Sequence, residues 1–79
     1  METTTVNFAG KDFEVLANAG NDFFALRAIV RAKAAPELIF DAYDVVFLGR
    51  TDEYAEALGR DFEMVSKLYA LAVEGEPKN

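Results

Sequence analysis

The segment that most restricts the possible folds is PELIFDAYDVVFL, residues 36–48, because it is almost entirely apolar. Its only charged residues are Glu37, Asp41 and Asp44, at successive offsets of four and three. At about 100° per residue they share one stripe of an α-helix, whereas a β-strand would place Asp41 and Asp44 on opposite faces. We therefore predict a helix over residues 36–48, with Gly49 at its C′ position. Since this helix is apolar around most of its circumference, other elements must cover it on several sides.

A β-hairpin is predicted at the N-terminus from period-two alternation of apolar and polar residues. Val6 and Phe13 each lie in such a run, in the stretches TVNF and DFEVL. Between the runs lies Ala-Gly-Lys, in which Gly10 can adopt a positive φ. The strands are expected at residues 3–8 and 12–16.

The first helix is predicted at residues 23–35, which contain no Gly or Pro and several Ala. Asn21 or Asp22 can cap its N-terminus. One side of the predicted helix is apolar and carries Phe23, Leu26 and Val30, with Ile29 at its edge. Another side is cationic and carries Arg27 and Arg31. This pattern is typical of an amphipathic helix.

Two further helices are predicted in the C-terminal part, at residues 52–58 and 62–73. Thr51 is expected to cap the first and Asp61 the second, while Gly59 interrupts the helical pattern between them. One kinked helix is the alternative. The predicted fold class is α+β: an N-terminal β-hairpin followed by a small bundle of three to four α-helices. Residues 1–74 form a single domain, and residues 75–79 are predicted to be a flexible C-terminal tail.

The sequence offers little material for catalysis. It contains no Cys and no His, and Ser66 is its only Ser, so Ser-His and Cys-His nucleophile pairs are excluded. The carboxylates of Glu37, Asp41 and Asp44 are interpreted as a solvated stripe that can also face Arg27 and Arg31, rather than as a metal site. We predict no enzymatic activity, no cofactor and no metal.

The overall charge and hydrophobicity favour protein partners. A net charge of −6 disfavours binding to nucleic acid, and there is no apolar run of 18 residues to span a membrane. The N-terminus lacks the pattern of a signal peptide, so a cytoplasmic location is expected. Yet 52% of the 79 residues are hydrophobic, including seven Phe. This excess predicts a homo-oligomer or a bound partner.

The order of these features resembles the tail assembly chaperones of long-tailed bacteriophages and prophages. The similarity covers residues 6–74 and includes the hairpin VNFAGKDFEV, the stretch FLGRTDEYAEAL and the final helix DFEMVSKLYALAVE. Leu48, Gly49 and Tyr54 match the loose pattern of the family. The resemblance implies a non-enzymatic protein in the host cytoplasm. Such a chaperone binds the apolar, helical tape measure protein, keeps it soluble, and releases it as the tail-tube protein polymerises around it.

A chaperone for an apolar helix needs a groove of apolar and aromatic side chains. Helical phase indicates Phe40, Tyr43 and Phe47 as the partner-binding residues, with Phe24 on the flank of the first helix. Two alternatives remain open at this point. One is a small acidic regulator that inhibits a basic or nucleic-acid-binding partner, and the other is a self-assembling structural component of the virion.

Overall fold

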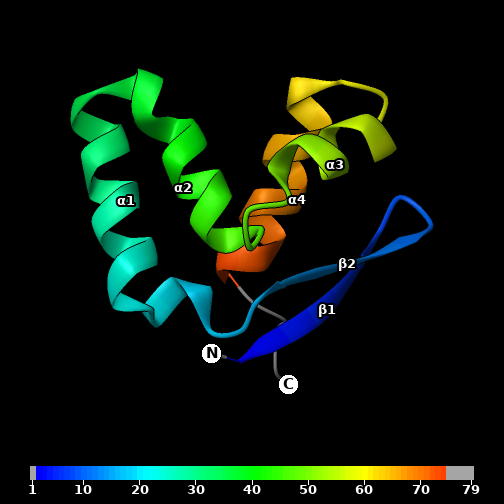
Figure 1. Ribbon diagram of the computed structural model, residues 1–79, viewed down its shortest axis with the longest axis horizontal. Helices are drawn as coiled ribbons and strands as arrows, with labels where there is room; N and C mark the ends of the chain where they lie inside the picture. Colours follow the sequence, from blue (N-terminus) through cyan, green and yellow to red (C-terminus); the bar gives the residue numbers. More distant parts are fainter. Residues whose placement is uncertain (1, 75–79) are drawn as a thin grey trace.

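The computed structural model describes residues 2–74 and confirms the predicted α+β fold, a two-stranded antiparallel hairpin followed by four α-helices (Figure 1). The predicted C-terminal tail at residues 75–79 lies outside the described residues. The elements in chain order are β1 (Thr3–Phe8), β2 (Lys11–Leu16), the 3₁₀ helix η1 (Ala19–Asn21), α1 (Phe23–Ala34), the 3₁₀ helix η2 (Pro36–Leu38), α2 (Ile39–Val46), α3 (Thr51–Ala57) and α4 (Phe62–Glu74).

The hairpin has a two-residue turn. Phe8 pairs with Lys11, so only Ala9 and Gly10 connect the strands, and β2 begins one residue earlier than predicted. Both turn residues have positive φ, 54° and 77°, as a type I′ turn requires. The alternation predicted from the sequence is confirmed on the inner face, where the paired Val6 and Phe13 are buried.

We expect Ala9→Asn to stabilise the protein by about 0.5–1 kcal/mol, because Asn tolerates the left-handed conformation that strains Ala. Ala9 is exposed, so the substitution changes little besides the turn. Thermal unfolding monitored by circular dichroism would measure the gain. The β-branched variant Ala9→Val should instead lose stability, and equal stabilities of the two variants would contradict the positive φ at this position.

Helix α1 begins where Asp22 caps it and ends before Pro36. The Oδ1 atom of Asp22 accepts hydrogen bonds from the backbone N–H groups of Phe24 and Ala25, at 2.9 and 3.0 Å. The buried residues of α1 are Ala25 and Ala32, seven positions apart on the face that packs against α2. Small side chains on this face allow the two helix backbones to approach closely. The larger apolar residues of the helix therefore lie on its other sides.

Helix α2 occupies the middle of the molecule, as its apolar circumference predicted. It lies between α1 and α4, and it also contacts α3 and β2 (Figure 1). The predicted helix over residues 36–48 is shorter in the structure, because Pro36 begins a 3₁₀ turn and the α-helical residues are Ile39–Val46. Ala42, Tyr43 and Val46 are buried on it.

The end of α2 differs from the prediction by one residue. Leu48, not Gly49, occupies the C′ position, with φ at 59°. The N–H of Gly49 donates to the carbonyl oxygen of Asp44 at 2.7 Å, and this bond closes a Schellman motif. A left-handed Leu costs about 1–2 kcal/mol, but its side chain packs against the core. That packing offsets the strain and explains why the glycine is not required there.

Helices α3 and α4 are separate, and the alternative of one kinked helix is wrong. Gly59 and Arg60 both have positive φ between them. Asp61 caps α4 as predicted, since its Oδ1 accepts from the N–H of Glu63 at 2.9 Å. The prediction for Thr51 is wrong: it is the first residue of α3, and its hydroxyl donates to Asp44 Oδ1 at 2.6 Å. The buried hydroxyl therefore joins α2 to α3 instead of capping a helix.

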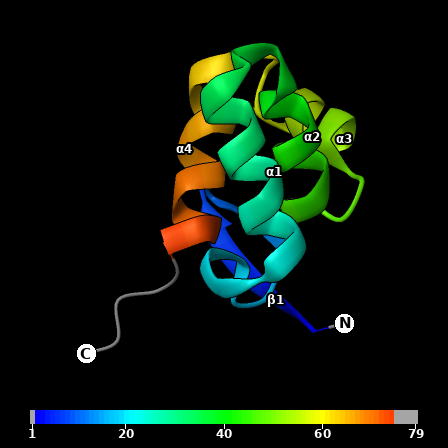
Figure 2. The same cartoon turned by 90° about the vertical axis from the view of Figure 1, so that its left-hand side faces the viewer.

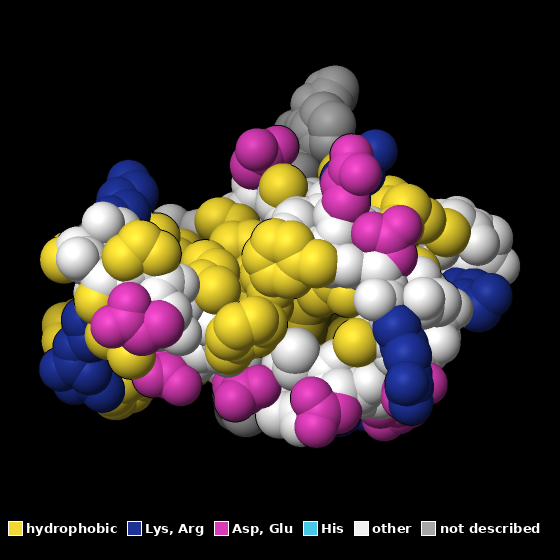
Figure 3. All heavy atoms as spheres, turned by 90° about the horizontal axis from the view of Figure 1, so that it is seen from above, with side chains coloured by type: hydrophobic (Ala, Val, Ile, Leu, Met, Phe, Trp, Pro, Cys, Tyr) yellow, Lys and Arg dark blue, Asp and Glu magenta, His cyan; other side chains and the backbone are white. Residues whose placement is uncertain are grey.

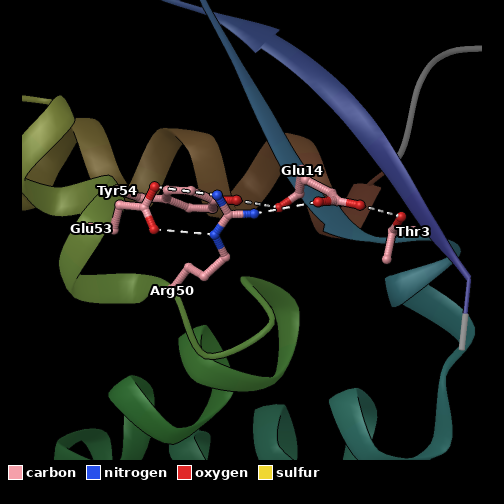
Figure 4. A network of polar contacts seen from close by, with 5 residues as sticks. All are labelled: Thr3, Glu14, Arg50, Glu53 and Tyr54. Atoms are coloured by element: carbon pink, nitrogen blue, oxygen red, sulfur yellow. Dashed lines mark hydrogen bonds and ion pairs between the residues drawn. The ribbon is translucent and has the colours of Figure 1, made fainter.

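A polar network fastens the hairpin to the start of α3 (Figure 4). Arg50 forms ion pairs with Glu14 of β2, at 3.3 Å, and with Glu53 of α3, at 3.2 Å. The hydrogen bond from Arg50 holds the pKa of the Glu53 carboxyl below its usual value. Beside this pair, the hydroxyl of Tyr54 donates to the backbone oxygen of Glu14 at 2.6 Å, and Thr3 donates to the Glu14 carboxylate at 2.7 Å.

In the part of the chain that the structure describes, no helix is both long and apolar enough to cross a membrane.

Candidate functional site

Two phenylalanine rings lie side by side on the surface where the N-terminal ends of α2 and α4 meet. Phe40 of α2 and Phe62 of α4 are 53% and 56% exposed, and their ring centroids are 6.2 Å apart. The buried ring of Tyr43 lies within 5.9 and 6.1 Å of the two. We call Phe40, Tyr43 and Phe62 the aromatic patch. Figure 3 views this side of the molecule, and hydrophobic side chains fill its centre.

The local structure of each helix start positions these rings. Phe40 is the second residue of α2, directly after the 3₁₀ turn at Pro36, and Phe62 is the first residue of α4, directly after its cap. The hydroxyl groups of Tyr43 and Ser66 are hydrogen-bonded at 2.8 Å and connect α2 to α4 beneath the patch. The separation between the two helix starts is therefore set by a specific contact.

The patch rests on a continuous series of aromatic contacts in the core. From Tyr43, the series passes through Phe47, at 5.7 Å between centroids, and Tyr54, at a further 5.5 Å, to Phe13 of the hairpin, at 4.9 Å. Tyr69 of α4 lies 4.6 Å from Tyr43. Because interiors packed in this way are rigid, the aromatic patch lies on a rigid support.

One member of this cluster has an unsatisfied polar group. Within residues 2–74, the buried hydroxyl of Tyr69 has no hydrogen-bond partner. Burial, and to a lesser extent the neighbouring Tyr43, raises the pKa of Tyr69 above its ordinary value. An unpaired buried hydroxyl is destabilising relative to an apolar group of the same shape.

We therefore expect Tyr69→Phe to leave stability unchanged or raise it by up to about 1 kcal/mol. Tyr54→Phe is the matched control, because its hydroxyl is bonded to the backbone oxygen of Glu14. That variant should lose about 1–1.5 kcal/mol. Urea unfolding of both variants measures the difference, and a larger loss in Tyr69→Phe than in Tyr54→Phe would show that the Tyr69 hydroxyl is satisfied.

Acidic side chains surround the aromatic patch. Magenta groups lie around the hydrophobic centre in Figure 3. Four exposed carboxylates lie close in sequence to the two phenylalanines, at Glu37, Asp41, Asp61 and Glu63. In the described part of the chain, only Glu63 among these four has an ion-pair partner, Lys67 at 3.9 Å. The patch therefore combines an apolar centre with an acidic rim.

The structure separates the four residues predicted to bind a partner. Phe40 is exposed in the aromatic patch, but Tyr43 and Phe47 are core residues, only 2% and 0% exposed. Phe47 thus offers no surface to a partner in this fold, and this corrects the expected groove. Phe24 is 57% exposed but lies on α1, where it borders a different groove. Partner binding by the exposed residues remains a prediction.

Sequence reasoning missed Phe62. Its helical phase, shared with Val65 and Leu68, indicated the inner face of the last helix. Those two residues are buried, whereas Phe62 is exposed because α4 begins there and its first side chain extends past the neighbouring elements. Because Asp61 was expected to cap the last helix, Phe62 was expected to be its first residue, and that position could have indicated that Phe62 is exposed.

The groove beside Phe24 lies between α1 and α2 and has a volume of about 320 Å³. Arg27, Arg31 and Asp41 are among its lining residues, so one carboxylate of the acidic stripe lies near the arginines. However, among residues 2–74 neither arginine forms an ion pair. The guanidinium of Arg27 instead lies 5.0 Å from the centre of the Phe24 ring.

The carboxylates of the acidic stripe point to different neighbours in the structure. Asp44 accepts the hydrogen bond from Thr51, and Asp41 faces the groove with the arginines. Within the described residues, no three acidic side chains are grouped so that they could hold a metal ion.

No protein-family model, no curated protein and no solved structure matches this chain. The similarity to tail assembly chaperones therefore depends on the order of sequence features alone, and the function that it implies is a proposal.

Proposed function

We propose that this protein is a phage tail assembly chaperone, which binds apolar helical segments of a tape measure protein and keeps them soluble. The observation that carries the proposal is the aromatic patch, in which Phe40 and Phe62 are exposed side by side over a rigid support. Amphipathic or apolar helices are commonly bound by such preformed aromatic surfaces. Large, rigid aromatic side chains are also the residues that contribute most to binding energy at interfaces.

The acidic rim fits the same role. The carboxylates around the patch, together with the net charge of −6, would keep a coated apolar partner dispersed through repulsion between complexes. The rim contributes little to affinity for an uncharged helix, so the apolar contact should dominate binding. Affinity should therefore change little with salt.

The genes that flank the coding sequence provide the first test. The proposal expects a tail-tube gene upstream and a very long tape measure gene downstream. An unrelated neighbourhood would contradict it.

Co-expression with that tape measure protein tests the activity directly. Wild-type protein should increase the soluble fraction of the tape measure protein after centrifugation, and the double variant Phe40→Ser, Phe62→Ser should lose this effect. The matched control is Leu71→Ser, which removes another exposed apolar side chain of α4 outside the patch and should retain activity. Retained activity in the double variant would exclude the patch as the binding site.

Salt dependence separates this function from that of an acidic regulator. A regulator that binds a basic partner through its carboxylates would lose affinity steeply as ionic strength rises. Such a loss, with no effect of the Phe40→Ser, Phe62→Ser double variant, would replace the chaperone proposal with the regulator.

A further inference from the structure

Helix α1 has a second exposed surface, of opposite charge to the aromatic patch. Among residues 2–74, seven large apolar side chains are exposed, and four of them are on α1. We call this set the α1 surface, and its members are Phe23, Phe24, Leu26 and Val30. The buried residues of the helix are alanines, so its larger apolar side chains lie outside the core. Of these four, Phe24 borders the groove between α1 and α2, and Figure 2 shows α1 on the outside of the molecule.

Helix α1, which carries the α1 surface, is cationic, although the chain as a whole is strongly acidic. The helix carries Arg27, Arg31 and Lys33 and no acidic residue. Since these three positive charges belong to a chain of net charge −6, the remaining residues together carry −9. Elsewhere in the described part of the chain, Arg50, Arg60 and Lys67 pair with glutamates, and only Lys11 does not. None of the three cationic side chains of α1 forms an ion pair there.

This charge distribution decides what can cover the α1 surface. Two copies of α1 packed against each other would bring six positive charges together, and like charges at an interface are strongly unfavourable. The occupant must be apolar at its centre and acidic around it. The aromatic patch has both properties, with Phe40 and Phe62 at its centre and the exposed carboxylate of Asp61 directly beside Phe62.

We infer that the α1 surface of one copy docks on the aromatic patch of a second copy. The apolar side chains of α1 would contact the exposed rings, and Arg27 and Arg31 would pair with the acidic rim. The two surfaces are different regions of the molecule, α1 on its outer side and the patch at the N-terminal ends of α2 and α4 (Figures 1 and 2). Each copy can therefore bind two neighbours, one through each surface.

Such a contact is heterologous, so it produces a ring if the rotation between copies closes and a filament if it does not. The inference goes beyond the proposed function and holds without any tape measure protein. A partner helix that binds the aromatic patch would displace α1 of the neighbouring copy. Measurements on the chain alone therefore test self-association separately from the chaperone activity.

Sedimentation velocity of the purified full chain at increasing concentration tests the inference with two variants. The α1 variant is Phe23→Ser, Val30→Ser, and the patch variant is Phe40→Ser, Phe62→Ser. All four side chains are exposed, so both variants should keep the wild-type circular dichroism spectrum. Wild type should form oligomers, and each variant alone should weaken self-association about tenfold or more.

Mixing the two variants is the decisive measurement. Each retains the surface that the other has lost, so an equimolar mixture should form a 1:1 dimer and nothing larger. A mixture that stays monomeric, or an α1 variant that still assembles like wild type, would overturn the inference. A concentration-independent wild-type monomer would overturn it as well.

Charge reversal provides a second, independent variant. Arg27→Glu, Arg31→Glu keeps the four apolar side chains of the α1 surface but places acidic groups opposite the acidic rim. It should abolish self-association, and wild-type association should weaken as salt is raised. Assembly that is unaffected by this variant would show that charge complementarity does not direct the contact. Leu71→Ser, an exposed position outside both surfaces, should assemble like wild type.

Discussion

Replacing Phe47 with alanine should lower the free energy of unfolding by about 3–5 kcal/mol. The ring is fully buried and contacts Tyr43, Tyr54 and Tyr69, which come from three different helices. Truncating a buried Phe to Ala costs about 3–5 kcal/mol, through lost burial and the cavity that remains. A domain of 79 residues has a total stability of about 4–12 kcal/mol, so the loss removes a large part of it.

Urea unfolding followed by circular dichroism measures this effect. The matched control is Phe40→Ala, an identical truncation seven residues earlier on the same helix segment. Since Phe40 is half exposed, that variant should lose about 1 kcal/mol or less. Similar losses in the two variants would mean that Phe47 is not the core residue that the structure describes. The two variants therefore distinguish a buried position from an exposed one on a helix whose sequence is apolar on almost every side.

Gly20→Ala should be the second most damaging substitution, although it adds only one methyl group. Gly20 lies in η1, where the chain passes against the last turns of α4. A Cβ atom at this position would overlap the backbone carbonyl oxygen of Val73, which cannot rotate away as a side chain could. Either η1 or the end of α4 must shift, at a cost of about 1–3 kcal/mol.

The neighbouring Asn21→Ala is the control for this prediction. Asn21 is exposed in the same 3₁₀ turn, and it does not cap α1, since Asp22 does. Its loss should stay within about 0.5 kcal/mol. Thermal unfolding of both variants gives the comparison. If Gly20→Ala were as stable as Asn21→Ala, the close packing of η1 on α4 would be contradicted.

The sequence predicted most of the fold because local chemistry decides the elements. Alternation at Val6 and Phe13 identified the hairpin, and Gly59 with Asp61 marked the boundary between the last two helices. The errors at Thr51 and Leu48 have one cause. Neither residue follows the usual preferences for the ends of helices, because each makes a tertiary contact. Thr51 contacts Asp44, and Leu48 packs against the core.

The candidate site was predicted only in part. Phe40 was identified as a surface aromatic residue, whereas Phe47, one heptad later, became core and Phe62 was missed. Helical phase places Phe40 and Phe47 on one flank of the helix, but it does not say how far along the helix the covering elements extend. In the structure, α3 and α4 cover the end of α2 that carries Phe47, and its beginning remains exposed.

By itself, the sequence determined the secondary structure, the central position of the apolar helix and the scarcity of catalytic groups. Only the tertiary structure decided which apolar residues stay outside. Helix α1 shows the reason: it is apolar on one side and alanine-rich on another, and either side is compatible with burial. The alanine face faces α2 in the structure, with small side chains at the contact, so Phe23, Leu26 and Val30 remain at the surface. Packing between helices selects this outcome, and no periodicity in a single sequence encodes it.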